Sequence, residues 1–399
     1  MVAARNVQLR KISVVTTSRA DYGILRPVMK YIDEDPELEL EILASGTHLS
    51  KAFGSTIGEI EEDGFAVKHR VEMLLSSGTP EATSISMGLA TMGFARVYAQ
   101  SRPDILVVLG DRFEMHAAAL AALPATIPVA HIHGGEITAG AIDESLRHSI
   151  TKLSHLHFVS TEKHAQRVIQ LGEEPWRVTV SGSPSLDNIA DHQDLPIDEL
   201  EEIAGIPLPD RGFLVATFHP ATVEWEEAGN QAHELFTALD QLDLPVLFSL
   251  PNVDPGGFDL REMTLRAVSE RPNWNAVENM GTRAYFTVLR TAAAMVGNSS
   301  SGLIEAPSFA LPTLNIGSRQ QGRERGANII DVPCTCAAIV EGISKAISPD
   351  FRASLAGLSN PYGDGKASPR IVSRLRSEPL TGRLVKKTFF DQAEVKTGQ

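Results

Sequence analysis

The chain has 399 residues, 43% of them hydrophobic, which is enough for two or three domains with substantial cores. Its formal net charge of −14 disfavours a polyanionic partner, so we expect no nucleic-acid binding, although a local basic pocket could still hold a nucleotide. No apolar run approaches transmembrane length, and the first residues lack the apolar segment of a signal peptide. We therefore expect a cytoplasmic protein without a membrane partner.

The two cysteines, Cys334 and Cys336, are separated by one residue. They are badly placed for a disulfide and too few for a zinc site. We interpret them as small apolar residues in a reducing compartment.

Short apolar runs alternate with helical patterns through the first half of the chain. Strands are expected at residues 11–17, 38–45, 65–72, 104–110, 127–132, 156–160 and 177–182. Helices are expected at residues 23–32, 80–100, 113–123 and 163–171. Strands that alternate with helices of this length indicate βαβ units and a parallel sheet.

The alternation stops in a polar, proline-containing stretch, residues 191–211, which we interpret as a bridge between domains. It then resumes, with strands expected at residues 212–220, 245–252, 274–279, 293–300 and 312–317. A turn-rich crossover and one more helix are expected within residues 359–375. The fold class is therefore α/β, with two doubly wound domains in tandem.

The stretch IPVAHIHGGEITAGAIDESLRH, residues 127–148, gathers titratable side chains at the end of one strand. A glycine pair breaks the strand and delivers Glu136 into a loop, and Asp143 then opens a helix that carries Arg147. In open α/β sheets, ligands bind at the carboxyl ends of the strands.

The preceding strand ends in LGDRFEMH, which places Asp111 and Arg112 at the same kind of edge. From position alone, Asp111 is as well explained by a helix cap as by a catalytic base. If the strands are neighbours, Asp111 converges with Glu136 and Asp143. Crowded carboxylates raise one another's pKa, which suits general acid and base catalysis.

His131 and His133 alternate on the predicted strand and would face the same side, which is the spacing of an HxH metal site. We favour the other interpretation, in which one histidine is packed and the other is hydrogen-bonded to a loop. The first strand is followed by TTSRADYG, where Arg19 is either a phosphate ligand or a surface arginine.

In the second half, VGNSSSGLIEAPSFALP ends a strand in a turn of small residues. Ser299, Ser300 and Ser301, with free backbone amides at the start of a helix expected over residues 303–310, would make an anion site. Glu305, one turn further on, could accept hydrogen bonds from a ribose diol. The alternative is an ordinary serine-capped helix.

Three more residues follow strands of the second domain or lie in its basic loop. His219 could bind a phosphate or protonate a leaving group, and a buried structural histidine is the alternative. Asn252 lies at the equivalent position at the end of the next predicted strand, and Arg319 lies in the basic loop SRQQGRERGAN. No GxSxG, HExxH, GxGxxG or Walker motif is present, so serine hydrolases, zincins and dinucleotide oxidoreductases lack support.

Together these motifs resemble one family, the hydrolysing UDP-N-acetylglucosamine 2-epimerases, which include bacterial sialic-acid-pathway enzymes and half of the bifunctional animal enzyme. The matching motifs are SRADYG, GDRFE, HIHGGE with DESLRHSITK, FHP, GNSSSGLIE with NIGSRQQGRERG, and NPYGDG. They span roughly residues 11 to 375 in the family's order. Non-hydrolysing members carry GDT and an EAG-type motif where this chain has GDR and HGGE, which favours the hydrolysing branch.

The resemblance implies a GT-B architecture with two Rossmann-like domains, nucleotide in the cleft, and a C-terminal helix that crosses back to the first domain. We expect residues 1–190 to form the N-terminal domain, completed by about 364–399, and residues 191–363 to form the C-terminal, UDP-binding domain. The family also suggests a homo-oligomer, a dimer or tetramer.

The implied reaction removes the proton at C2 of the sugar, expels UDP from C1 to leave a glycal, and hydrates the glycal to a free sugar of the N-acetylmannosamine type. This scheme needs neither metal nor NAD as a cofactor. By motif match, Asp111, Glu136 and Asp143 are acid/base candidates, and His219 would meet the phosphates. The residues expected to hold UDP are Arg19, Arg112, Asn252, Ser299, Ser300, Glu305 and Arg319, with Ser301 and Asp187 in support.

Several alternatives stay open at this point. The substrate could be UDP-N-acetylglucosamine or the UDP-2,4-diacetamido-trideoxyhexose of legionaminic acid synthesis. The protein could instead be a non-hydrolysing epimerase, a GT-B glycosyltransferase, a metal-dependent hydrolase or a non-catalytic nucleotide-sugar sensor, because fold alone does not choose among them.

Overall fold

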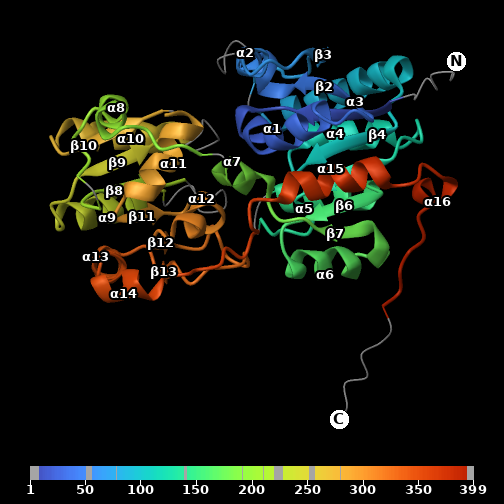
Figure 1. Ribbon diagram of the computed structural model, residues 1–399. Helices are drawn as coiled ribbons and strands as arrows, with labels where there is room; N and C mark the ends of the chain where they lie inside the picture. The colour runs from blue at the N-terminus through green and yellow to red at the C-terminus, as the bar shows by residue number, and fades with distance from the viewer. Residues whose placement is uncertain are drawn as a thin grey trace, which may run out of the picture. The chain divides into compact units, whose positions relative to one another are not determined.

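The computed structural model describes residues 9–50, 56–77, 79–138, 142–190, 192–209, 211–219, 228–250, 257–278 and 280–392 (Figure 1). The chain divides into two compact units. Unit 1 consists of Met1–Glu136, Ile142–Asp187 and Gly365–Gln399, and unit 2 consists of Ile137–Ala141 and Asn188–Asp364. Among the described residues, no helix has both the length and the apolar character needed to cross a membrane.

Unit 1 contains a parallel seven-stranded sheet in the order β3-β2-β1-β4-β5-β6-β7. The strands are β1 (Arg10–Thr16), β2 (Leu38–Ser45), β3 (Val67–Val71), β4 (Ile105–Leu109), β5 (Val129–Ile132), β6 (Leu156–Val159) and β7 (Val178–Val180). The central strands are rich in valine, isoleucine and leucine and are buried, as expected for a sheet covered on both faces. The direction of winding reverses between β1 and β4, which makes that position the switch point of the sheet.

The helices that follow these strands begin at recognisable caps. Ser18 accepts a hydrogen bond from the amide of Asp21, and Thr79 accepts one from the amide of Ala82. The helices of unit 1 are α1 (Arg19–Asp33), α2 (Ile57–Glu62), α3 (Pro80–Ser101), α4 (Phe113–Ala122), α5 (Ile142–Leu153), α6 (Glu162–Gln170), α15 (Ala367–Ser377) and α16 (Gly382–Val385). The short helix α7 (Asp187–Ala190) begins at a residue of unit 1 and continues into unit 2.

Unit 2 repeats the plan with a parallel six-stranded sheet in the order β10-β9-β8-β11-β12-β13. Its strands are β8 (Leu214–Thr217), β9 (Val246–Ser249), β10 (Trp274–Val277), β11 (Ala294–Gly297), β12 (Thr313–Ile316) and β13 (Ile329–Val332). Its helices are α8 (Ile197–Ala204), α9 (Ala228–Asp240), α10 (Gly257–Ser269), α11 (Gly281–Thr291), α12 (Ser301–Ile304), α13 (Cys336–Ala346) and α14 (Pro349–Ser354). Here the switch point lies between β8 and β11.

The predicted α/β class with two doubly wound parallel sheets is confirmed, and the local differences include α8 and β13. Helix α8 lies inside the stretch interpreted as a bridge, because Leu200 and Ala204 form an apolar face that packs into the core of unit 2. The edge strand β13 was not predicted, since its residues IIDV are only partly buried and form too short a run to stand out.

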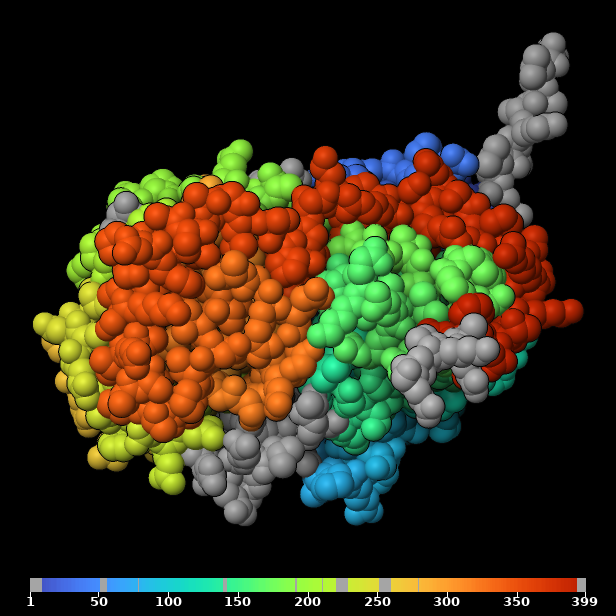
Figure 2. Space-filling view, turned by 90° about the horizontal axis from the view of Figure 1, so that it is seen from below, coloured from blue at the N-terminus to red at the C-terminus, as the bar shows by residue number. Residues whose placement is uncertain are grey.

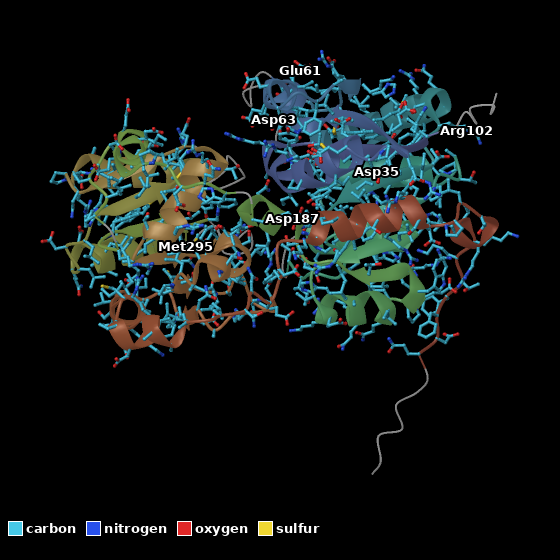
Figure 3. All side chains as sticks on the ribbon, viewed as in Figure 1. Asp35, Glu61, Asp63, Arg102, Asp187 and Met295 are labelled. Carbon is cyan, nitrogen blue, oxygen red and sulfur yellow. The ribbon has the colours of Figure 1, made fainter. Side chains whose placement is uncertain are left out.

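The C-terminal helix α15 belongs to unit 1, and Asp187 holds its start (Figure 3). The carboxylate of Asp187 accepts hydrogen bonds from the amides of Ala367, at 2.9 Å, and Ser368, at 2.5 Å. Two free N–H groups of a helix start are thereby satisfied. Asp187 therefore fixes the returning helix in place. Figure 2 shows the C-terminal residues, in red, on the surface beside the green residues of unit 1.

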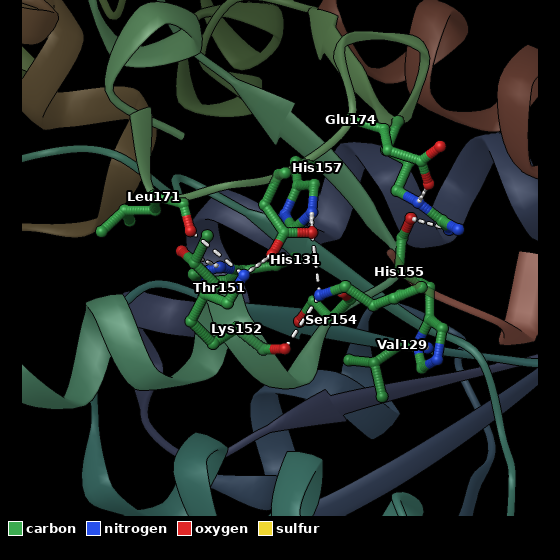
Figure 4. Close-up of polar contacts among 12 residues, drawn as sticks. Val129, His131, Thr151, Lys152, Ser154, His155, His157, Leu171 and Glu174 are labelled. Atoms are coloured by element: carbon green, nitrogen blue, oxygen red, sulfur yellow. Dashed lines mark hydrogen bonds and ion pairs between the residues drawn. The ribbon is translucent and has the colours of Figure 1, made fainter. Parts of the chain in front are cut away.

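The segment after α15 is anchored by the buried carboxylate of Glu173. Its oxygens lie 2.6 Å from Lys152 Nζ, 3.0 Å from His157 Nε2 and 2.8 Å from Lys387 Nζ (Figure 4 shows the surroundings of His157 and Lys152). Burial by itself would raise the pKa of Glu173, but hydrogen bonding and the charges of its partners lower it to about 2. An ionised glutamate thus ties the C-terminal segment to α5 and β6.

Candidate active site

Asp111 lies two residues after the end of β4 and pairs with Arg147 of α5. The side chain of Arg147 is only 5% exposed, and its other terminal nitrogen donates to the carbonyl oxygen of His133 at 2.8 Å. Strands β4 and β5 are paired, so the segments that follow them meet at one edge. The buried guanidinium of Arg147 therefore contacts both the segment after β4 and the segment after β5.

Glu136 lies in the loop after β5 and is 4% exposed. Its Oε1 accepts a hydrogen bond from Ser160 at 3.0 Å and lies 3.5 Å from His133 Nδ1. The turn needs unusual backbone: Gly135 has φ +76°, and a Cβ there would lie 2.5 Å from the carbonyl oxygen of His164. The glycine thus permits the turn that delivers Glu136 to its partners.

Asp143 is the second residue of α5 and is half-buried. Burial raises its pKa, and the negative charge of Asp111 raises it further, while Arg112 and Arg147 act in the opposite direction. Asp143 therefore keeps its proton to a higher pH than an ordinary aspartate. A carboxyl with a raised pKa beside ion-paired or hydrogen-bonded carboxylates suits general acid catalysis.

Arg112 is held by two carboxylates that the sequence analysis did not select. Its Nη2 donates to Glu114 Oε1 at 2.9 Å, and its Nε lies 4.0 Å from Asp21 Oδ2. Burial raises the pKa of both Asp21 and Glu114, and the charge of Arg112 opposes that effect. Both acids lie in the first turn of a helix. Acidic residues are common there because they interact favourably with the helix dipole, so the sequence alone gave no reason to assign them to a site.

Arg19 is the first residue of α1 and lies at the surface. Its Nε is 3.1 Å from Glu59 Oε2, and each of the two side chains is more than a third exposed. Its proposed contact with a phosphate stays a prediction.

The histidine pair does not have the geometry that the sequence suggested. Strand β5 ends at Ile132, and His133 has φ +64°, so the two histidines do not alternate on one strand. His131 is buried between Gly110 O, at 2.7 Å, and Thr151 Oγ1, at 3.2 Å, and burial lowers its pKa to about 3. His133 Nε2 is bonded to Ser183 Oγ at 3.1 Å. Within the described residues, no group of three or more His, Cys, Asp or Glu could hold a metal ion.

In unit 2, the ends of β8 and β11 are locked together by Asn298. Its side chain accepts a hydrogen bond from the amide of His219 at 2.7 Å and donates to the carbonyl of the same residue at 2.8 Å. The close approach requires Gly297, which has φ +134° and whose Cβ would lie 1.9 Å from the oxygen of Thr217. Burial, then the charge of Arg319, lowers the pKa of His219 to about 3, so its imidazole is neutral.

The serine turn follows directly, but the helix after it differs from the prediction. Helix α12 spans only Ser301–Ile304 and gives way to a 3₁₀ turn over Ala306–Phe309, because Pro307 cannot continue an α-helix. Glu305 lies at the junction. The Ser301 hydroxyl accepts a hydrogen bond from Tyr285 at 2.7 Å, whereas Ser299 and Ser300 are half-exposed at the turn.

The basic loop reaches the same turn. Arg319 and Gln320 donate to the carbonyl oxygen of Asn298, at 3.0 Å and 2.7 Å. Hydrogen-bond donors from β8, β11 and this loop are therefore assembled within unit 2. Asn252, predicted to join them, lies outside the described residues.

Comparison with known proteins identifies the family. Residues 30–376 match the family model described as UDP-N-acetylglucosamine 2-epimerase. The chain belongs to this family. It is therefore an enzyme of the 2-epimerase type, as the motifs led us to expect.

Two relatives of this epimerase chain are named as hydrolysing. A UDP-N,N′-diacetylbacillosamine 2-epimerase (hydrolyzing) of Legionella pneumophila is 36% identical over 380 residues, which is 95% of this chain and 99% of the relative. A GDP/UDP-N,N′-diacetylbacillosamine 2-epimerase (hydrolyzing) of Campylobacter jejuni is 36% identical over 385 residues, or 96% and 99% of the two chains. These matches agree with assignment to the hydrolysing branch.

The epimerase fold is confirmed by solved structures. The Methanocaldococcus jannaschii UDP-GlcNAc 2-epimerase, in complex with UDP-GlcNAc and UDP, superimposes with a TM-score of 0.75 at 19% identity. The match covers 92% of this chain and 99% of that one, so the GT-B type architecture extends over nearly the whole molecule.

Proposed function

We propose that the protein is a hydrolysing 2-epimerase that converts a UDP-activated, N-acetylated amino sugar to UDP and the free 2-epimer. The observation that carries this proposal is the carboxyl cluster of unit 1, in which burial and the charge of Asp111 raise the pKa of Asp143 while Asp111 is paired with Arg147. A reaction that removes and returns a proton at carbon needs carboxyl groups in both states.

Position in the sheets supports the choice of residues. Arg19 follows β1 and Asp111 follows β4, on either side of the switch point of the first sheet. His219 follows β8 and the serine turn follows β11, on either side of the switch point of the second. Open α/β sheets bind ligands at these positions.

The proposed reaction begins when a carboxylate, Asp111 or Glu136, takes the proton from C2. The C2–H electrons form the C1=C2 double bond, and the C1–O bond breaks with its electrons passing to the β-phosphate of UDP. The glycal is then protonated at C2 from the opposite face, with Asp143 as the proposed donor, and water adds at C1. The product is the free sugar with inverted C2.

The proposed UDP ligands in unit 2 stabilise the leaving group. A neutral His219 can donate a hydrogen bond to a phosphate oxygen, and Arg319 supplies positive charge beside it. Ser299 and Ser300 offer hydroxyl donors, and Glu305 can accept from the ribose hydroxyls. Arg112, whose orientation is fixed by Glu114 and Asp21, is also proposed to bind UDP.

The substrate that we propose first is UDP-N,N′-diacetylbacillosamine, a 2,4-diacetamido-trideoxyhexose, which is named for both 36% identical relatives. UDP-N-acetylglucosamine, whose product would be N-acetylmannosamine, is the comparison substrate. The product of the first substrate would serve legionaminic acid synthesis, and that of the second sialic acid synthesis. We further propose a cytoplasmic homo-oligomer.

The test is product analysis by NMR after incubation with each UDP-sugar, before and after exhaustive chelation. We expect UDP and a free 2-epimer as products, with the higher kcat/KM for the diacetamido substrate. Chelation should cause no loss of activity. A mixture of UDP-sugars would indicate a non-hydrolysing epimerase, and sugar transferred to an acceptor with unchanged C2 would indicate a glycosyltransferase. Full activity of Asp111→Asn and Glu136→Gln would refute the proposed site.

A further inference from the structure

The two carboxylates that could take the C2 proton, Asp111 and Glu136, are held in different ways. Asp111 is paired with Arg147, whose side chain is only 5% exposed. If Asp111 accepted a proton, the buried guanidinium would lose this counter-charge, which is costly. Glu136 accepts a hydrogen bond from the Ser160 hydroxyl and lies beside the imidazole of His133. Protonation of Glu136 leaves the Asp111–Arg147 pair intact, so the ion pair favours Glu136 as the base.

The backbone of His133 is held on both sides of the residue. Its amide donates to the carbonyl oxygen of Phe158 on β6 at 2.9 Å, and its carbonyl oxygen accepts from Arg147 at 2.8 Å. Its φ of +64° is uncommon for residues other than glycine. Such conformations persist where the surrounding contacts enforce them, and they cluster at active sites. These contacts fix the direction in which the imidazole leaves the backbone.

The imidazole of His133 links Glu136 to two buried serines. Its Nε2 lies 3.1 Å from Ser183 Oγ, which lies 3.0 Å from Ser185 Oγ. Its Nδ1 lies 3.5 Å from Glu136 Oε1. When Ser183 donates to Nε2, the ring proton lies on Nδ1 and faces the carboxylate. Ser185, Ser183 and His133 then form a chain of donors that ends at Glu136.

We propose that Glu136 is the base that removes the C2 proton and that His133 is its positioning residue. His133 and Ser160 both contact Oε1, so the two carboxylate oxygens are not equivalent, and Oε2 is assigned the proton transfer. In this step an O–H bond forms at Glu136 as the C2–H bond breaks. The C2–H electrons form the C1=C2 bond, and UDP leaves from C1 with the electrons of the C1–O bond. The inference rests on the proposed function and deepens it by choosing between the two carboxylates.

This assignment gives Asp111 a role that requires its negative charge. The ion pair holds Arg147, whose other terminal nitrogen holds the carbonyl oxygen of His133. The charge of Asp111 also helps to raise the pKa of Asp143, the proposed proton donor. An Asp111 that stays ionised throughout the reaction supports both the base and the acid.

Substitutions at position 133 separate the imidazole from the backbone conformation. Asparagine tolerates a positive φ and offers a side-chain N–H, so His133→Asn should retain activity within about tenfold of the unaltered protein. His133→Gly keeps the φ but removes the ring, and it should lower kcat by about a hundredfold with little change in KM. His148→Gln is the control and should retain most of the activity. Circular dichroism checks that each variant folds.

Supplying the glycal together with UDP separates hydration from elimination. Glu136→Gln and His133→Gly should hydrate the glycal at close to the rate of the unaltered protein, because they impair only removal of the C2 proton. Asp143→Asn should lose hydration, since it lacks the proposed donor. A fall in hydration equal to the fall in the full reaction would overturn the role of His133, as would a His133→Gly variant as active as His133→Asn.

The same pair of assays decides between the carboxylates. An Asp111→Asn variant that loses elimination and keeps hydration, beside a Glu136→Gln variant that keeps both, would assign the base to Asp111 and overturn the proposal. The unaltered protein is the reference for each reaction. If it forms no free 2-epimer from either UDP-sugar, the proposed function falls and this inference falls with it. If it forms the 2-epimer and Glu136→Gln does so equally fast, only this inference falls.

Discussion

Arg147 forms a buried ion pair with Asp111, and the same guanidinium donates to the carbonyl oxygen of His133. The arginine thus fixes a proposed catalytic carboxylate and, at the same time, the turn that leads to Glu136. We infer that the acid/base geometry depends on a planar group with several donors.

Replacing Arg147 by lysine should therefore reduce kcat by about ten- to a hundredfold, with a smaller change in KM. A lysine keeps the charge but cannot contact both oxygens in the same geometry. Steady-state kinetics measure the effect. His148→Gln is the matched control on the next residue of α5, and it should retain most of the activity. Equal losses in both variants would argue against this role of Arg147.

The raised pKa of Asp143 predicts a pH dependence. As a proton donor it is active below its pKa, so kcat should fall as pH rises through that value. Asp143→Asn removes the donor, and it should lower kcat by about a hundredfold or more and abolish this limb of the profile. A pH–kcat profile of both proteins checks this. An unchanged alkaline limb in the variant would assign it to another group.

His219 should stay neutral in the ligand-free protein across the range in which histidines usually titrate, since burial and Arg319 lower its pKa to about 3. NMR of the imidazole should show no titration between about pH 5 and 8. His219→Asn should weaken UDP binding by about tenfold, measured by calorimetry. A titration near pH 6.5 would contradict the neutral state.

The Glu173 anchor makes a prediction about acid stability. Its pKa is lowered from 4.5 to about 2, so its stabilising contribution is present above pH 4.5 and is lost as pH falls toward 2. At neutral pH, Glu173→Gln should lower the free energy of unfolding by about 3 kcal/mol, because the largely buried Lys387 loses its counter-charge. Urea unfolding measures this, with exposed Glu62→Gln as control. If the free energy of unfolding depended on pH in the same way in both variants, the assignment of this acid-dependent stability to Glu173 would be refuted.

Sequence patterns predicted the sheets because β-branched runs and helix caps act locally. Strand β2 has the predicted bounds, and the bounds of α3 and α4 differ from the prediction by one residue. The strand ends then predicted which loops carry polar side chains. The assignment of Asp111 and Glu136 to one edge followed from this regularity of parallel sheets.

Long-range pairing could not be predicted in the same way. The partners of Glu136 include Ser160 and those of Arg112 include Asp21, and each of these partners follows a different strand from the residue that it contacts. The positive φ of His133 also depends on the fold, because this conformation is rare for residues other than glycine. Because of this backbone conformation, His131 and His133 do not form an HxH pair, and each makes its own hydrogen bonds.

The central claim is that UDP is eliminated and that the glycal is then protonated at C2 from the opposite face, with water adding at C1. It is tested most directly by running the reaction in heavy water with UDP-N,N′-diacetylbacillosamine. The account predicts UDP and a free 2-epimer that carries one deuterium at C2, seen by NMR and mass spectrometry. A free product that retains hydrogen at C2, or one with unchanged C2 configuration, would contradict it.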